Sequence, residues 1–211
     1  MRKVGLFVVF AMAMATVAGA NLIVNGDFST GDETGWTQWR ANWGSGETWA
    51  VTAANGIPAP AGFTDSTNDS GSFGWYQAIT TPTPGPYAMT ADWEGTVGGG
   101  GWAEVMFFTV PTGTDPAGVA DVGNAADVAF KKDSWGLNPP TTWGWEAANL
   151  SPMTGGNGGF VTVNAGEDLV VATKTGNSAA VYFDNIVVVP EPATVVLGFA
   201  GLGMLLRRRR R

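Results

Sequence analysis

Short runs of β-forming residues alternate with clusters of glycine, proline, asparagine and aspartate along most of this chain. The 31 glycines and 12 prolines supply many turns, and no stretch shows a long amphipathic helical pattern. Regularly spaced short strands are typical of a β-sandwich. The expected strands are residues 22–24, 36–40, 48–52, 74–80, 87–96, 102–110, 128–131, 160–164, 169–175 and 180–189.

The segments between these runs predict the connections. Glycines 98–101 indicate a flexible hairpin that pairs residues 87–96 with residues 102–110. Three longer polar segments are expected to form surface loops; they are residues 57–68, 111–123 and 136–159. The sequence shows no internal repeat and no second domain.

The N-terminus has the pattern of an export signal. Arg2 and Lys3 precede an apolar run at residues 4–17, and the small residues 18–20 form a cleavage site. Cleavage by a signal peptidase would make Asn21 the first residue of the mature chain. The expected organisation is a signal peptide at 1–20, one β-sandwich domain at 21–189 and a C-terminal segment at 190–211.

The C-terminal segment combines three features in order. Pro190, Glu191 and Pro192 precede the charge-free residues 193–206, and five arginines follow: Arg207, Arg208, Arg209, Arg210 and Arg211. An apolar stretch beside a basic cluster indicates a membrane segment whose basic end stays in the cytoplasm. A helix over 193–206 would span only about 21 Å of a hydrocarbon core of about 30 Å.

This tail resembles the PEP-CTERM sorting signal of biofilm-forming Gram-negative bacteria. The resemblance implies a short transmembrane helix and processing by an exosortase. It also implies an inner-membrane intermediate, followed by release to the cell surface or the extracellular matrix. An ordinary C-terminal tail anchor is the alternative.

Composition excludes several kinds of chemistry. The chain has no cysteine and no histidine, so it lacks zinc sites of the usual kind and any Ser-His or Cys-His nucleophile. Residues 21–189 contain four basic and seventeen acidic residues, a net charge of −13. Such a domain would repel a phosphate backbone, so we expect no nucleic-acid partner. Aromatic residues are abundant, with ten Trp, eleven Phe and three Tyr, and we expect some of the tryptophans to lie outside the core.

The body carries a second resemblance. Residues 21–28, residues 75–79 and 87–93, and the closing run 181–186 are similar to carbohydrate-binding modules with the galactose-binding-like jelly roll. The resemblance implies an all-β fold with a single jelly-roll β-sandwich. It also implies a structural calcium ion held by Asp27 and Asp184. The module family usually has a glutamate where this chain has Ser29, and the alternative is that Asp27 and Asp184 serve only a turn and a strand.

The alternation of side chains predicts a ligand-binding face. If Tyr87 and Trp93 point into the core, a period of two places every second residue of this and the neighbouring strands outside. The expected outward set is Trp75, Gln77, Asp92, Glu94, Trp102 and Glu104. Indole rings stack on sugar rings and carboxylates accept hydrogen bonds from hydroxyl groups, so this set predicts a polysaccharide site. The alternative is that loops cover this face and its tryptophans pack in a second small core.

Three functions follow from these patterns. The first is an exported, non-catalytic surface or matrix protein that associates with extracellular polysaccharide. The second is a structural or self-associating envelope protein without a small ligand. The third is a glycoside hydrolase that uses Glu94 and Glu104 as its acid pair.

Overall fold

The computed structural model describes residues 20–41, 46–66, 71–134 and 141–191. Residues Ala20–Glu191 form one compact unit. The predicted signal peptide and the predicted membrane segment 193–206 lie outside the described residues. Within the described ranges, no helix is long and apolar enough to cross a membrane.

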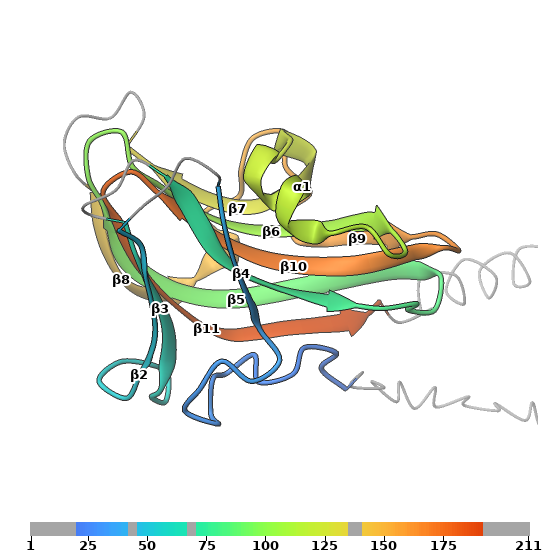
Figure 1. Cartoon of the computed structure of the whole chain (residues 1–211), viewed down its shortest axis with the longest axis horizontal. Coiled ribbons are helices and arrows are strands. Elements are labelled where there is room, and N and C mark those ends of the chain that lie inside the picture. The colour runs from blue at the N-terminus through green and yellow to red at the C-terminus, as the bar shows by residue number, and fades with distance from the viewer. Residues whose placement is uncertain (1–19, 42–45, 67–70, 135–140, 192–211) are drawn as a thin grey trace, which may run out of the picture. The chain divides into compact units, whose positions relative to one another are not determined.

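Two antiparallel sheets build this unit, which confirms the predicted all-β sandwich (Figure 1). Sheet A has the strand order β1-β4-β10-β6-β7, and sheet B has the order β2-β3-β11-β5-β8. A further strand of sheet B, β9, pairs with the N-terminal part of β5. The strands of sheet A are β1 Thr37–Arg40, β4 Ser72–Ile79, β10 Glu167–Gly176, β6 Trp102–Pro111 and β7 Val128–Asp133. Those of sheet B are β2 Thr48–Thr52, β3 Ala61–Asp65, β11 Ala179–Pro190, β5 Gly85–Val97, β8 Thr141–Ala147 and β9 Phe160–Val163.

The main core lies between the sheets. It contains Trp75, Trp93, Phe107 and Phe183, none of which is measurably exposed. A smaller apolar cluster covers the outer side of sheet A, where α1 (Pro116–Val122) packs on strand residues such as Met106. Two short 3₁₀ helices, η1 (Ala125–Asp127) and η2 (Ala148–Leu150), complete the fold.

The structure corrects three expectations about the elements. Residues 22–24 form no strand, whereas β3 and β8 arise inside two segments that were expected to be loops, and α1 lies in the third. Most of the other predicted strands agree with the structure within two residues.

The predicted hairpin between β5 and β6 is wrong, because these strands belong to different sheets. The glycine segment connects sheet B to sheet A at one end of the sandwich. It packs there on the β10–β11 connection, which also runs from one sheet to the other. A Cβ on Gly101 would lie 2.2 Å from the Asn177 carbonyl oxygen, so only glycine fits this crossing. Gly98 donates a backbone hydrogen bond to Ser178. The glycines therefore permit close crossing of two connections between the sheets.

Candidate functional site: an aromatic and acidic face on sheet B

The six residues of the predicted ligand face do not share one face. Trp75 points into the main core, where its ring lies 5.7 Å from Phe28 and no part of it is exposed. Gln77 is also buried: its side chain accepts a hydrogen bond from the Val24 amide at 2.7 Å and donates to the Val24 carbonyl at 3.0 Å. These two residues therefore hold the N-terminal segment and the core together.

Trp102 and Glu104 point away from the main core, as predicted, but on the outer side of sheet A. Glu104 is almost fully buried between Lys131, at 3.1 Å, and Lys174, at 3.8 Å. Burial lowers the pKa of Lys174, although the nearby Glu104 opposes this shift. The Trp102 ring lies over Gly176, where a Cβ would meet it at 2.3 Å. Trp102 therefore serves packing, and Glu104 serves charge pairing.

Asp92 and Glu94 lie on the outer side of sheet B, as predicted. Their neighbours across the β5–β11 ladder are Asp184 and Tyr182. Tyr182 forms an aromatic pair with Phe63 of β3, with ring centroids 4.5 Å apart. All four strand residues Phe63, Tyr182, Asp92 and Glu94 are partly exposed.

A third aromatic residue reaches this face through a β-bulge in β8. Trp143 and Glu146 both contact the buried Trp93, so both side chains point inward. The register shift between them leaves an extra residue, and bulged residues share the side of the residue that they oppose. Trp145 therefore lies on the outer side of sheet B, opposite Glu94. We call the set Phe63, Asp92, Glu94, Trp145 and Tyr182 the sheet B face.

The loop between β2 and β3 covers part of this face with polar contacts. The Asn55 amide donates a hydrogen bond to Glu94, and the Asn185 amide donates to Asp92 and to the Ile57 carbonyl, both at 3.0 Å. The Ile57 amide donates to Asp184 at 2.6 Å. These contacts hold carboxylate and amide groups beside the three aromatic rings.

The six strands of sheet B contain no lysine and no arginine. The carboxylates of Asp92 and Glu94 are therefore not matched by basic residues of their own sheet. This balance disfavours anionic ligands and suits neutral ligands that donate hydrogen bonds from hydroxyl groups.

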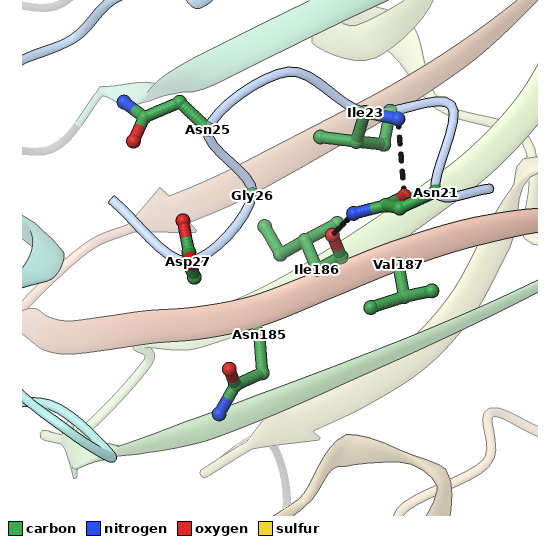
Figure 2. A pocket seen from close by; sticks show the side chains of 8 residues that line it. All are labelled: Asn21, Ile23, Asn25, Gly26, Asp27, Asn185, Ile186 and Val187. Atoms are coloured by element: carbon green, nitrogen blue, oxygen red, sulfur yellow. Dashed lines mark hydrogen bonds between the residues drawn. The ribbon is translucent and has the colours of Figure 1, made fainter. Parts of the chain in front are cut away.

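A pocket of about 310 Å³ lies between the N-terminal segment and β11, beside the predicted calcium ligands (Figure 2). Its wall is made of Asn21, Ile23, Asn25, Gly26, Asp27, Asn185, Ile186 and Val187. The Asp27 carboxylate and the asparagine amides supply oxygen donors of the kind that calcium takes. The described residues contain no group of three acidic side chains arranged to hold a metal ion.

Asp184 is fully buried next to this pocket without lining it. Its two carboxylate oxygens accept hydrogen bonds from the Ile57 and Asn185 amides. Burial raises the pKa of Asp184, and the negative charges of Asp27 and Asp92 raise it further, although the two hydrogen bonds oppose this shift. The negative charges of Asp27, Asp92 and Asp184 would attract a cation to this pocket. The Asp184 carboxylate, however, already accepts hydrogen bonds from two amide groups.

The predicted ligand face omits Phe63 and Trp145, because the sequence predicts loops where β3 and β8 lie, and it also omits Tyr182. The adjacent β-forming residues Phe63 and Thr64 were the only local signal for β3. Asn55 and Asn185 carried no local signal, because their role depends on how a distant loop folds over the sheet.

No protein-family profile and no curated protein matches this chain. Solved structures with a similar fold include a family 61 carbohydrate-binding module in complex with beta-1,4-galactotriose, which is 16% identical, covers 81% of this chain and 99% of its own, and has a TM-score of 0.45. A putative sugar binding protein from Bacteroides thetaiotaomicron is 12% identical over 81% of this chain and 100% of its own, with a TM-score of 0.48.

A third similar structure is the C-terminal family 22 carbohydrate-binding module of Clostridium thermocellum Xyn10B. It is 10% identical over 80% of this chain and 96% of its own, with a TM-score of 0.48. At such identities and TM-scores, these three structures assign no ligand to this chain.

Proposed function

We propose that this protein is an exported, non-catalytic surface or matrix protein that associates with extracellular polysaccharide through the sheet B face. The observation that carries the proposal is the Phe63–Tyr182 pair beside Glu94, with Trp145 on the other side of that carboxylate. Aromatic rings cover the C–H faces of sugar rings, and the carboxylates and amides accept or donate hydrogen bonds to hydroxyl groups.

The export part of the proposal rests on the two ends of the sequence. A signal peptidase would remove residues 1–20, and an exosortase would process the segment that begins at Pro190. The protein would pass through an inner-membrane intermediate before it reaches the cell surface or the matrix. The resemblance of the tail to the PEP-CTERM signal and its basic end support this route.

Binding without catalysis is the form that the geometry supports. Glu94 and Glu104, the acid pair of the hydrolase alternative, lie on opposite outer faces of the sandwich and cannot flank one glycosidic bond. Asp92 and Glu94 sit on one strand of one face, where they are hydrogen-bonded to amide groups.

We also propose a structural calcium ion at the pocket between the N-terminal segment and β11. Asp27 and the amide oxygen of Asn185 are the side chains that would hold it, because the Asn25 amide oxygen already accepts a hydrogen bond from the Thr30 amide. When bound, calcium would offset the negative charge of Asp27, Asp92 and Asp184 and would stiffen the junction.

Affinity electrophoresis tests the binding proposal most simply. The purified protein migrates through native gels that contain the exopolysaccharide of the producing organism, a neutral glucan or no glycan. We expect retardation by the exopolysaccharide that Tyr182→Ala reduces and that Trp102→Ala, on the opposite face, leaves unchanged. Equal migration of the wild-type protein in all gels would contradict binding and favour a purely structural role.

A further inference from the structure

Two residues of the predicted sorting motif belong to the folded sheet. Pro190 is the last residue of β11 and stands opposite Tyr87 of β5. The Glu191 amide continues this ladder, because it donates a hydrogen bond to the Pro86 carbonyl at 2.9 Å. The body therefore holds the chain in an extended, paired form as far as Glu191.

The N-terminal segment closes the other edge of β11 at the same end. β3 pairs with β11 only as far as Phe183, and beyond that point residues 21–26 take its place. The Ile186 amide donates to the Gly26 carbonyl at 2.9 Å, and the Leu22 amide donates to the Val188 carbonyl at 2.9 Å. The end of β11 is thus flanked on both sides.

Asn21 makes the closing contacts with its side chain (Figure 2). Its Oδ1 accepts hydrogen bonds from the Val188 amide at 2.9 Å and from the Ile23 amide at 3.0 Å. Its Nδ2 donates to the Ile186 carbonyl at 3.1 Å. We call these three hydrogen bonds the Asn21 clamp.

Together with the Leu22 amide, the clamp pairs both backbone polar groups of Val188. Its amide bonds Asn21, its carbonyl accepts from Leu22, and its side chain is fully buried. A peptidase binds its substrate as an extended segment with unpaired edges, so it reaches a paired strand only after local unfolding. A cut at or before Pro190 would require that the end of β11 separate from both neighbours.

We propose that Asn21, the first residue after the predicted leader, is a positioning residue that fixes the C-terminal boundary of processing. The clamp holds the end of β11 up to Val188, and the ladder with β5 holds Pro190 and Glu191, so the cut falls C-terminal to Glu191. In that step a peptide C–N bond breaks, water or an acceptor amine forms the new bond to the carbonyl carbon, and the leaving nitrogen takes a proton. The boundary rests on the proposed export and processing, whereas the clamp can be tested without it.

Limited digestion with thermolysin, which cuts before aliphatic residues, tests the clamp. The full chain is purified in detergent as wild type, Asn21→Ala and Asn164→Ala, and the products are read by intact mass. Asn164 is the matched control, because its amide also bonds locally, to Glu167, at the β9–β10 turn. Leu22→Pro serves as a second variant that deletes one amide donor to Val188.

We expect the wild type and Asn164→Ala to give resistant products that end at or beyond Glu191. Asn21→Ala should be cut within residues 186–189 at least about tenfold faster, since each lost hydrogen bond loosens the strand end several-fold. A tenfold change corresponds to about 1.4 kcal/mol, so the melting temperature should fall by only about 3–5 °C and the body should stay folded. An Asn21→Ala pattern equal to that of Asn164→Ala would overturn the clamp.

The intact mass of the protein released by the producing cells tests the boundary. A C-terminus at or beyond Glu191 supports it, and a C-terminus at or before Pro190 overturns it. If the cells release only the full chain, the proposed processing and its boundary are both wrong, while the thermolysin comparison still decides the clamp.

Discussion

The carboxylates of Glu94 and Glu104 lie on opposite outer faces of the sandwich, with both sheets between them. Glu94 is partly exposed beside Tyr182, and Glu104 is buried between Lys131 and Lys174. Although both residues belong to acidic, aromatic strands, their surroundings therefore give them different tasks, and substitutions should separate them.

Glu94→Gln should weaken polysaccharide binding with little loss of stability. The substitution keeps the size of the side chain but removes the charge that accepts hydrogen bonds beside Tyr182. We expect a loss of affinity of about fivefold, because a hydrogen bond to a neutral amide oxygen is about 1 kcal/mol weaker than one to a carboxylate; titration of tryptophan fluorescence measures it. An unchanged affinity would exclude Glu94 from the site.

Glu104→Gln should destabilise the protein and leave the affinity unchanged. The substitution leaves Lys174 buried without its carboxylate partner, which should cost about 3 kcal/mol of unfolding free energy. Urea unfolding of both glutamine variants measures the contrast. Equal stability of the two variants would show that the Glu104 pairs contribute nothing.

Trp75→Ala should be among the most damaging substitutions in the core. The Trp75 side chain is fully buried beside Phe28, so truncation should lower the unfolding free energy by about 3–5 kcal/mol. Tyr182→Ala, on the sheet B face, should cost less than about 1 kcal/mol. Thermal unfolding followed by circular dichroism compares them, and a mild effect of Trp75→Ala would contradict its place in the core.

Asp168 should stabilise the protein in a pH-dependent way. Its Oδ1 accepts hydrogen bonds from the Thr81 amide at 2.9 Å and from the Thr112 hydroxyl at 3.0 Å, and the Thr81 bond is the main cause of its lowered pKa. Because the folded pKa lies below the ordinary value of 3.8, this stabilisation is complete above that value and is lost as the pH falls through the folded pKa.

The comparison of wild type with Asp168→Asn isolates this effect. The difference in unfolding free energy should stay constant from about pH 7 to about pH 5 and should shrink below about pH 4. Thr112→Val, which removes one of the hydrogen-bond donors to Asp168, should show a smaller change over the same range. A difference that grows in acid would contradict the stabilising role of the Asp168 carboxylate.

Calcium should raise the melting temperature of the wild type. A ligand at ten times its dissociation constant adds about 1.4 kcal/mol, which corresponds to roughly 3–5 °C for a domain of this size. Asp27→Asn should reduce the shift, while Asp115→Asn, at the start of α1, should keep it. Identical melting curves in calcium and in chelator would contradict the proposed ion.

The positions of most strands could be predicted from the sequence. In β5 and β6 the period of two also identified which side chains face the core. The inward face of β4 could not, since Tyr76 and Ala78 are apolar too: they pack in the second cluster on the outer side of sheet A. When a strand has apolar residues on both sides, its sequence does not indicate which side faces the core. The predicted outward position of Trp75 is wrong for this reason.

The pairing of strands was harder to predict than their existence. A run of glycines permits a hairpin or a crossing, and the choice depends on the distant Asn177–Ser178 connection that packs against it. The sheet B face could not be assembled for the same reason: Phe63, Tyr182 and Trp145 come together only through the β3-β11-β5-β8 order.

Polysaccharide binding through the sheet B face is tested most directly by the affinity of Tyr182→Ala and Trp102→Ala for the exopolysaccharide of the producing organism, measured by fluorescence titration beside the wild type. Both substitutions remove a partly buried aromatic ring, one from each outer face of the sandwich. We expect about a tenfold loss of affinity for Tyr182→Ala and wild-type affinity for Trp102→Ala. Equal affinities of all three proteins, or a loss confined to Trp102→Ala, would contradict it.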